Sequence, residues 1–343
     1  MNRLGEIAEA RLFGLTLAIG TRHFQARRPE TPFFRLTTMN NGRKLFHTLI
    51  ILPYARKQHK FSFAAVTLSA FIFFCLGASR AIVDNLKFKL TIAYDGTEYE
   101  GWQVQKIGTG VQEKVEAALA KLFPSRPRVH SSSRTDTGVH ALGMVAHFEI
   151  PRAECRMTSR KLALALNAWL PEDIRVLSAT RAPQGFHARF NAAGKQYRYF
   201  VWNHAAMNPL LRHTAWHVPR PLDLRAMRAA APFFVGKHDF QSFAANPGYA
   251  KESTVRTLTR CDLTRRGRLL TFVIEGDGFL YKMCRGIVGT LVQVGLGKFR
   301  ADEVKQMLGK RDRRVAGMTA PARGLVLWKV FYAHRPGRTG NSP

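Results

Sequence analysis

Five segments of the chain alternate apolar and polar residues in the way that half-buried strands do. In the first of them, KFKLTIAY, the apolar residues Phe88, Leu90 and Ile92 are separated by polar ones. A period of two places successive side chains on opposite faces of a sheet, so this segment predicts a strand with one buried face. The other four strand-like segments are residues 144–150, 196–202, 268–276 and 325–332.

Four further segments have the spacing of helices. In residues 111–122 the apolar side chains recur every three or four positions, which gives a helix one apolar stripe,. Thr109 followed three residues later by Gln112 resembles a capping box at the start of this helix. The other predicted helices are residues 161–169, 222–234 and 279–295, the last of them mostly apolar.

Strands and helices therefore form two successive sets, which predicts an α+β fold. We expect two similar α/β units with mainly antiparallel sheets, joined around a central basic cleft, with helices on the outer faces. The first unit would be residues 86–204 and the second residues 205–334. Residues 1–85 form a leader outside this pattern, and residues 335–343 have the composition of a disordered tail,.

The charge of the chain points to a polyanionic partner. The 343 residues carry a formal net charge of +30. Residues 1–85 hold 12 Lys and Arg against 4 Asp and Glu, which leaves +22 for residues 86–343. Such an excess attracts polyanions from a distance, so nucleic acid is the first expected partner and an anionic membrane the second.

The leader contains an uncharged run, FSFAAVTLSAFIFFCLGAS, at residues 61–79. Three interpretations stay open: a membrane anchor, an organelle-targeting segment, and upstream translation from a start codon assigned too early, which we favour. An anchor would be oriented by the basic residues before the run and would carry the rest of the chain across the membrane, where a nucleic-acid enzyme has no substrate. Any membrane contact would involve residues 61–79 alone.

The position of a shorter product's start would be unusual. No Met occurs between Met39 and Met144, so translation would begin at a codon read here as another residue, such as Val83 or Leu86. The expected location is the cytoplasm, or an organelle if the leader is a targeting segment.

Several classes of chemistry lose support because their motifs are absent. The cysteines at 75, 155, 261 and 284 have neither C-x-x-C spacing nor clustering, which argues against a zinc ribbon or a disulfide framework and fits a reducing compartment,. The sequence has no phosphate-binding loop, dinucleotide fingerprint, zinc-protease motif or nucleophile elbow,. The 12 histidines form no obvious ligand set, so we expect no metal and no cofactor.

The segment SSSRTDTGVHALG, residues 131–143, contains the candidate reactive group. Asp136 is its only acid, and an ionised aspartate held by a cation can act as a nucleophile without a metal,. Two other interpretations stay open. The segment can be a polar turn, or its D-T-G can belong to an aspartic protease, which needs two carboxylates and therefore a symmetric dimer.

Two cations can orient this aspartate. Arg134 is close in sequence, whereas Arg285 lies in the apolar predicted helix, where a guanidinium is costly unless an anion meets it or its head reaches water,. Tyr197 and Tyr199 alternate to one side of a predicted strand beside basic residues. Such tyrosines are either strand core or a surface on which a nucleobase stacks.

Eight collinear blocks resemble the tRNA pseudouridine synthase A family. They cover Lys87 to Tyr332, whereas residues 1–86 have no counterpart in the family pattern. The blocks are YDGTEYEGWQ, VQEKVEAAL, SSRTDTGVHALG, LNAWLPEDI, FHARFNAAGKQYRYFVWN, GKHDFQSF, FLYKMCRGIVGTLVQVG and TAPARGLVL.

This resemblance implies a function and a set of residue roles. The family isomerises uridine to pseudouridine at positions 38–40 of the tRNA anticodon arm, without cofactor or metal, usually as a homodimer. The family nucleophile corresponds to Asp136 and its arginine partner to Arg285. Tyr197 would stack on the uracil and assist removal of the C5 proton, and Arg134 and His140 would contact RNA.

One position departs from the family pattern. Ser133 stands where the family block often has Gly before R-T-D, and serine is compatible with a turn there. Two other functional classes stay open at this stage: a basic, non-catalytic RNA-binding protein and a retroviral-type aspartic protease.

Overall fold

The structure is a computed structural model that describes residues 84–105, 108–246, 248 and 253–332, together with the backbone of four earlier strands. These strands form two antiparallel pairs, β1 (Ala8–Leu12) with β2 (Leu15–Ile19) and β3 (Phe33–Asn40) with β4 (Arg43–Ile50). The chain divides into two compact units, Met1–Arg80 and Ala81–Pro343. The apolar run at residues 61–79 and the tail at residues 335–343 lie outside the described residues.

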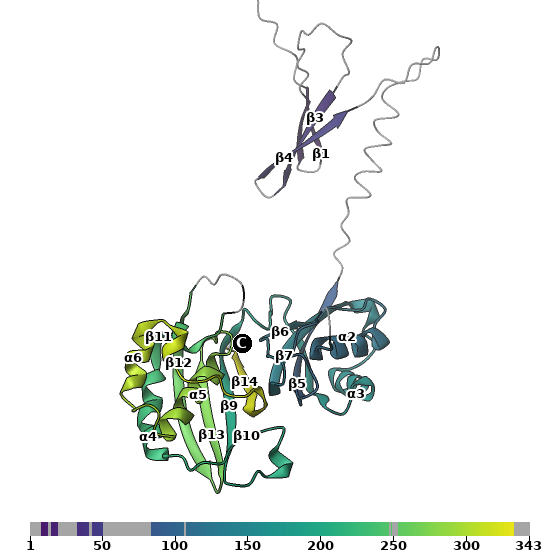
Figure 1. Cartoon of the computed structure of the whole chain (residues 1–343). Coiled ribbons are helices and arrows are strands. Elements are labelled where there is room, and N and C mark those ends of the chain that lie inside the picture. The colour runs from purple at the N-terminus through teal and green to yellow at the C-terminus, as the bar shows by residue number, and fades with distance from the viewer. Residues whose placement is uncertain are drawn as a thin grey trace, which may run out of the picture. The chain divides into compact units, whose positions relative to one another are not determined.

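The second unit is built on one sheet with ten strands among the described residues (Figure 1). Its main path runs in the order β11-β12-β13-β9-β14-β7-β5-β8, while β10 pairs with β9 and β6 with β7. The strands are β5 (Asn85–Tyr94), β6 (His130–Ser131), β7 (His140–Pro151), β8 (Ile174–Ala182), β9 (Ala192–Asn203), β10 (Trp216–Val218), β11 (Gly236–Asp239), β12 (Val255–Arg266), β13 (Leu269–Gly276) and β14 (Leu325–Tyr332).

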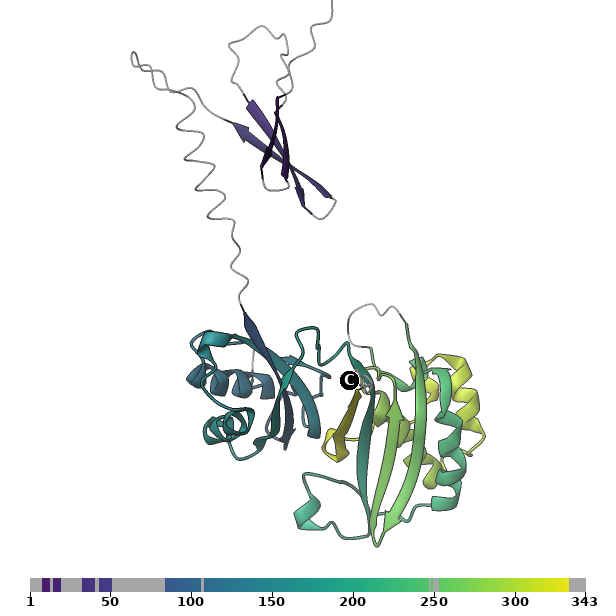
Figure 2. The same cartoon turned by 180° about the vertical axis from the view of Figure 1, so that it is seen from behind.

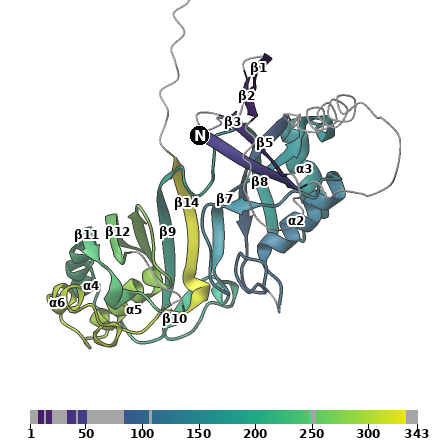
Figure 3. The ribbon, with the colours of Figure 1, turned by 90° about the horizontal axis from the view of Figure 1, so that it is seen from above.

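Five α-helices of this unit lie in two groups (Figures 1 and 2). They are α2 (Val111–Leu122), α3 (Ser159–Trp169), α4 (Leu224–Ala230), α5 (Met283–Gly295) and α6 (Glu303–Lys310). In the first half, α3 packs against β8 and α2 against α3; in the second half, α4 packs against α5 and β12. Seen from above, the two groups lie at opposite ends of the sheet (Figure 3). The predicted α+β class with mainly antiparallel pairing is confirmed.

The two halves of the sheet meet at a single strand pair. β14 pairs in parallel with β7, through Val326 opposite His140 and Leu327 opposite Ala141. On its other side β14 pairs antiparallel with β9, where Leu327 lies opposite Tyr197. The last strand of the sheet therefore brings the start of β7 and the middle of β9 to the same place. The proposed boundary between residues 204 and 205 falls just after β9.

The predicted helices are present, but some of their ends differ. The predicted capping box is absent, because Gly110 is the N-cap of α2 and no side chain caps it. The predicted helix at 222–234 becomes α4, capped by Asp223, followed by a short 3-10 turn that contains Pro232. The predicted helix at 279–295 begins only at Met283, since Lys282 adopts a left-handed conformation with φ of 57°.

Candidate active site

The loop that carries Asp136 is held by the segment after β5. The backbone N–H of Trp102 donates to the Thr135 carbonyl at 3.2 Å, and that of Gly138 donates to the Tyr99 carbonyl at 3.2 Å. A Cβ at Gly101 would lie 2.3 Å from the Thr135 carbonyl oxygen, so only glycine permits this approach,. The loop between β6 and β7 is therefore fixed from outside, and Asp136 with it.

Asp136 forms an ion pair with Arg285 of α5. The Arg285 Nη1 donates to Asp136 Oδ2 at 3.2 Å, and the side chains are 14% and 22% exposed respectively. Arg285 Nε also donates to the Ala320 carbonyl at 2.7 Å, which fixes the direction of the guanidinium. Arg285 lies among apolar side chains, and its positive charge is paired there with the Asp136 carboxylate instead of reaching water. The geometry thus favours the first of the two interpretations of Arg285.

The position of α5 depends on two close contacts. A Cβ at Gly286 would lie 2.2 Å from the Phe243 carbonyl oxygen, and one at Gly289 would lie 1.8 Å from that of Met318. Both neighbours are backbone atoms, so they cannot yield as a flexible side chain would. These glycines let the helix approach closely enough for Arg285 to reach the loop of Asp136.

Tyr197 lies on β9 and is 7% exposed. Its ring meets the edge of Phe279 at a centroid distance of 4.9 Å. Burial is the main reason that the pKa of Tyr197 is raised, so the phenol is neutral at physiological pH. Tyr199, on the same face, is fully buried and donates its hydroxyl proton to the Pro321 carbonyl at 2.7 Å. Of the two tyrosines, Tyr199 belongs to the core, and Tyr197 lines the pocket described next.

Asp136 and Tyr197 both line a pocket of about 580 Å³. That volume lies within the range of about 300–1,000 Å³ typical of small-molecule sites. Asp136 is the only carboxylate among its lining residues. The basic lining residues are Arg128, Arg134, Arg189, Lys195 and Lys282. A single negative group in a wall of cations is suited to bind a phosphodiester chain and to present one nucleophile to it.

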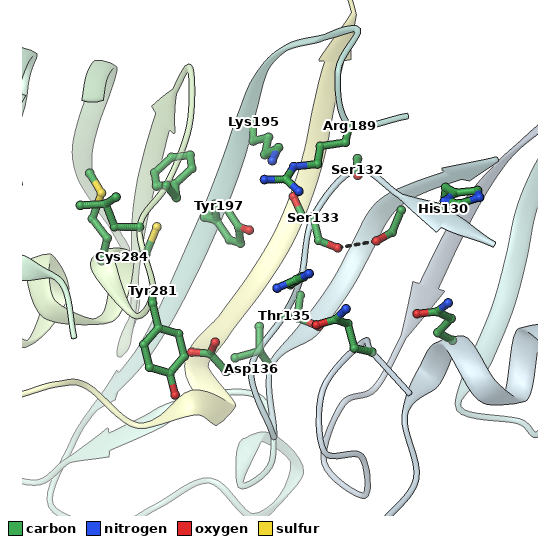
Figure 4. Close-up of a pocket in the computed structure, with 18 of the residues that line it drawn as sticks. His130, Ser132, Ser133, Thr135, Asp136, Arg189, Lys195, Tyr197, Tyr281 and Cys284 are labelled. Atoms are coloured by element: carbon green, nitrogen blue, oxygen red, sulfur yellow. Dashed lines mark hydrogen bonds between the residues drawn. The ribbon is translucent and has the colours of Figure 1, made fainter. Parts of the chain in front are cut away.

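Figure 4 shows how the labelled residues are arranged. Asp136 and Tyr281 lie at one end of the view, Lys195 and Arg189 at the other, and Tyr197 between them. Burial, and then the charges of Arg189 and Arg256, lower the pKa of Lys195 to about 8. This amine is therefore only partly neutral at physiological pH and keeps a positive charge in most molecules.

Arg134 and His140 occupy different environments. Arg134 is exposed on the pocket wall, and no hydrogen bond or ion pair of its guanidinium occurs within the described ranges. His140 is 4% exposed and does not line the pocket. Its Nε2 lies 3.0 Å from the carbonyl oxygens of His213 and Arg323, and its Nδ1 lies 3.0 Å from both the Gly96 N–H and an Asp95 oxygen.

The structure thus brings four of the five predicted site residues together and leaves His140 apart. The ring of His140 ties the start of β7 to the segment before β14, so its environment favours a positioning role at the joint. The predicted contact between His140 and RNA is not tested and stays a prediction.

Three histidines form a cluster that the sequence patterns did not reveal, and two of them, His130 and His187, line the pocket. The rings of His130, His147 and His187 have centroid distances of 4.6 to 5.9 Å. Burial, and then the neighbouring His187 and His130, lower the pKa of His147 to about 4, so it is neutral at physiological pH. Their positions in sequence are 17 and 40 residues apart, and only the pairing of β6 with β7 brings the first two together. Within the described part of the chain, no three His, Cys, Asp or Glu side chains are arranged to hold a metal ion.

No helix within the described residues is both long and apolar enough to cross a membrane. This finding does not cover residues 61–79, on which the three interpretations of the leader depend.

Comparison with known proteins identifies the class. A family model described as tRNA pseudouridine synthase matches residues 90–191 and 230–333. The tRNA pseudouridine synthase A of Acetivibrio thermocellus is 46% identical over 244 residues, which are 71% of this chain and 98% of that protein. The protein of the same name from Bacillus subtilis is 45% identical over 249 residues, which are 72% of this chain and 99% of that protein.

A third relative, tRNA pseudouridine synthase A of Geotalea uraniireducens, is 44% identical over 246 residues. This chain therefore belongs to the tRNA pseudouridine synthases, and its relatives place it in the synthase A family of that group. The family predicted from the eight sequence blocks is confirmed.

Proposed function

We propose that this protein is an isomerase that converts uridine to pseudouridine at positions 38–40 of the tRNA anticodon arm, with Asp136 as nucleophile. The observation that carries the proposal is the single carboxylate of a cation-lined pocket, 3.2 Å from the guanidinium of Arg285. Membership of the tRNA pseudouridine synthases supports the reaction class and the tRNA substrate.

The reaction needs no atom to be gained or lost. The bond between uracil N1 and ribose C1′ breaks, the base turns, and C5 bonds to C1′; the C5 proton leaves and N1 ends protonated. Asp136 would attack either C6 of the ring or C1′ of the ribose, and both routes stay open. Arg285 would orient the carboxylate, and it would stabilise the negative charge as it returns to the carboxylate oxygen.

Tyr197 would stack on the uracil and assist removal of the C5 proton. Because its phenol is neutral at physiological pH, it would receive that proton only while passing its own to a neighbour. The basic wall would grip the phosphates on either side of the target. That grip would offset the few kcal/mol needed to take the base out of its stack.

The proposal is tested by incubating the purified full chain with unmodified tRNA transcripts and mapping pseudouridine. We expect product at positions 38–40 and nowhere else in the transcript. Transcripts that bind tightly but stay unmodified would contradict the enzyme assignment and indicate a non-catalytic RNA-binding protein. A parallel sample of residues 81–343 measures whether the unit Met1–Arg80 contributes to activity.

Replacing Tyr197 with Phe should lower kcat by about 10²-fold with little change in KM, because stacking survives and the proton-transfer group is lost. Steady-state kinetics on one tRNA transcript measure kcat and KM. Tyr332→Phe is a matched control, because the partly buried Tyr332 hydroxyl donates to the Ala188 carbonyl at 2.7 Å and Tyr332 does not line the pocket. An unimpaired rate for Tyr197→Phe would remove the proton-transfer role.

Binding of tRNA should weaken steeply with salt. Counterion release from about five phosphate contacts predicts a loss of about 10²-fold in affinity between about 50 and about 200 mM salt. Filter binding with the full chain at several salt concentrations measures the slope. A flat response would contradict the phosphate-gripping role of the basic wall.

The assembly and the location belong to the same proposal. We propose a homodimer in which one tRNA contacts both subunits, a cytoplasmic location, and a role for Arg134 in holding the RNA. Residues 1–85 are proposed to lie outside the catalytic units 86–204 and 205–334.

A further inference from the structure

The side chain of Ser133 is a polar group on the pocket wall that lacks a closely aligned hydrogen-bond partner. The residue is 8% exposed, its oxygen is buried, and that oxygen has no hydrogen-bond partner among the described residues. Its two neighbours differ: the Ser131 hydroxyl donates to the Ser133 carbonyl at 2.8 Å, and the Ser132 hydroxyl contacts the Met144 sulfur at 3.6 Å. Buried hydroxyls nearly always have a partner, so this one requires an explanation.

The surrounding backbone leaves the loop little freedom to supply a partner. The Ser132 N–H donates to the Val145 carbonyl at 2.8 Å, and Thr135 is held through its carbonyl by Trp102 and through its hydroxyl by Tyr94 at 2.8 Å. Since the residues on both sides are fixed, the Ser133 oxygen cannot move far to reach another protein group. Ser133 itself forms part of the wall of the pocket (Figure 4).

The same hydroxyl lies near the phenol of Tyr197. Although burial dominates and raises the pKa of that phenol, a side-chain hydrogen bond with Ser133 acts in the opposite direction. That hydrogen bond lacks ordinary distance and alignment, so it is weak. The Ser133 hydroxyl can therefore exchange the Tyr197 phenol for a better partner beside the ring.

We propose that the Ser133 hydroxyl hydrogen-bonds to a polar edge atom of the target uracil, namely O2, O4 or N3–H, when the base lies against Tyr197. This inference rests on the proposed function and adds to it a residue that contacts the substrate. A hydroxyl can donate to a carbonyl or accept from an N–H, so it suits any of these three atoms. The contact holds the base while its bond to the ribose is broken.

The contact would be a property of this chain. Where the family block has Gly, no side-chain oxygen is present at this position, and the base edge must be satisfied in another way. The substitutions Ser133→Ala and Ser133→Gly remove the hydroxyl. The alanine variant is the cleaner test because it does not loosen the backbone.

The first measurement is the single-turnover rate of the full chain on an unmodified tRNA transcript. We expect Ser133→Ala to lower kcat/KM by about tenfold, the usual effect of losing one neutral hydrogen bond. The Tm of the free protein should change little, because only the weak contact with the Tyr197 phenol is lost. A variant as active as the wild type contradicts the contact, and a lowered Tm with unchanged kcat/KM shows a structural hydroxyl instead.

Ser242 provides a matched control. It is fully buried, does not line the pocket, and its oxygen accepts from the Asp312 N–H at 3.0 Å. Ser242→Ala should lower the Tm and leave kcat/KM unchanged, the reverse of the pattern expected for Ser133→Ala.

A second measurement separates contact with the base from an effect transmitted through Tyr197. If Ser133 contacts uracil, Ser133→Ala should lower kcat/KM by a similar factor in the Tyr197→Phe background. If it acts by orienting the phenol, that loss should disappear in this background, and the proposal is then wrong.

A third measurement identifies the atom. Transcripts that carry 2-thiouridine, 4-thiouridine or N3-methyluridine at the target position each alter one edge group. The penalty of Ser133→Ala should vanish for one of the three, and an undiminished penalty with all three contradicts the contact. If the wild-type protein modifies no transcript, the proposed function is wrong and this inference is wrong with it. If the wild type is active and Ser133→Ala has no effect, only the proposed contact of Ser133 is wrong.

Discussion

Asp136→Asn should abolish pseudouridine formation while tRNA binding persists. The amide keeps the size of the side chain but cannot act as a nucleophile, so kcat should fall by at least about 10⁴-fold, as expected for loss of a covalent catalyst. Affinity for tRNA should stay the same or rise slightly, because the pocket loses its only carboxylate. Pseudouridine mapping and filter binding on the same transcript measure the two effects.

The control for this substitution is Asp262→Asn. Asp262 is an exposed acid on β12 that pairs with Arg260 and does not line the pocket. Its replacement should leave both activity and binding unchanged. Appreciable turnover by Asp136→Asn would contradict the proposal that Asp136 is the nucleophile.

Arg285→Leu should have the second largest effect. Breaking this mostly buried ion pair leaves Asp136 without the cation that orients it, so kcat should fall by about 10²–10³-fold, as for the loss of one positioned donor in an active site,. Arg285→Lys should recover part of the activity, since it restores a charge but not the two hydrogen bonds of the guanidinium. Arg314→Leu, which removes an exposed ion pair with Asp312, should change nothing.

A double variant tests whether Arg285 acts through Asp136. Residues that work as a unit are not additive, so adding Arg285→Leu to Asp136→Asn should cost little further activity. A further full loss would show that Arg285 has an independent role, and near-normal activity of Arg285→Leu alone would show that it does not orient the carboxylate.

Much of the fold was predictable from local patterns. The period of two found β5, β9, β13 and β14, and also β7, which is buried on both faces over most of its length,. It did not find β8 and β12, most of whose residues are exposed or half-buried, or the short β6, β10 and β11. The pairing of β14 with both β9 and β7 joins residues that are far apart in sequence, so no local pattern predicts it.

The ion pair of the site was predictable from the sequence, because a buried charged side chain requires a partner of opposite charge. An arginine in an apolar helix needs an anion, which is why Arg285 pointed to Asp136 before any geometry was known. Sequence spacing could not place His140, because a residue four positions after Asp136 can face either the pocket or the junction between β7 and β14. It could not distinguish Tyr197 from Tyr199 either, since both lie on one face of a strand whose surroundings change along its length.

The place of β14 in the sheet also constrains the order in which the chain can assemble. Residues 325–332 are the final strand described, yet they separate β9 from β7 and so connect the loop of Asp136 to the strand of Tyr197. While these residues are still inside the ribosome, this connection cannot form. The two sides of the pocket are therefore joined only after β14 has been synthesised.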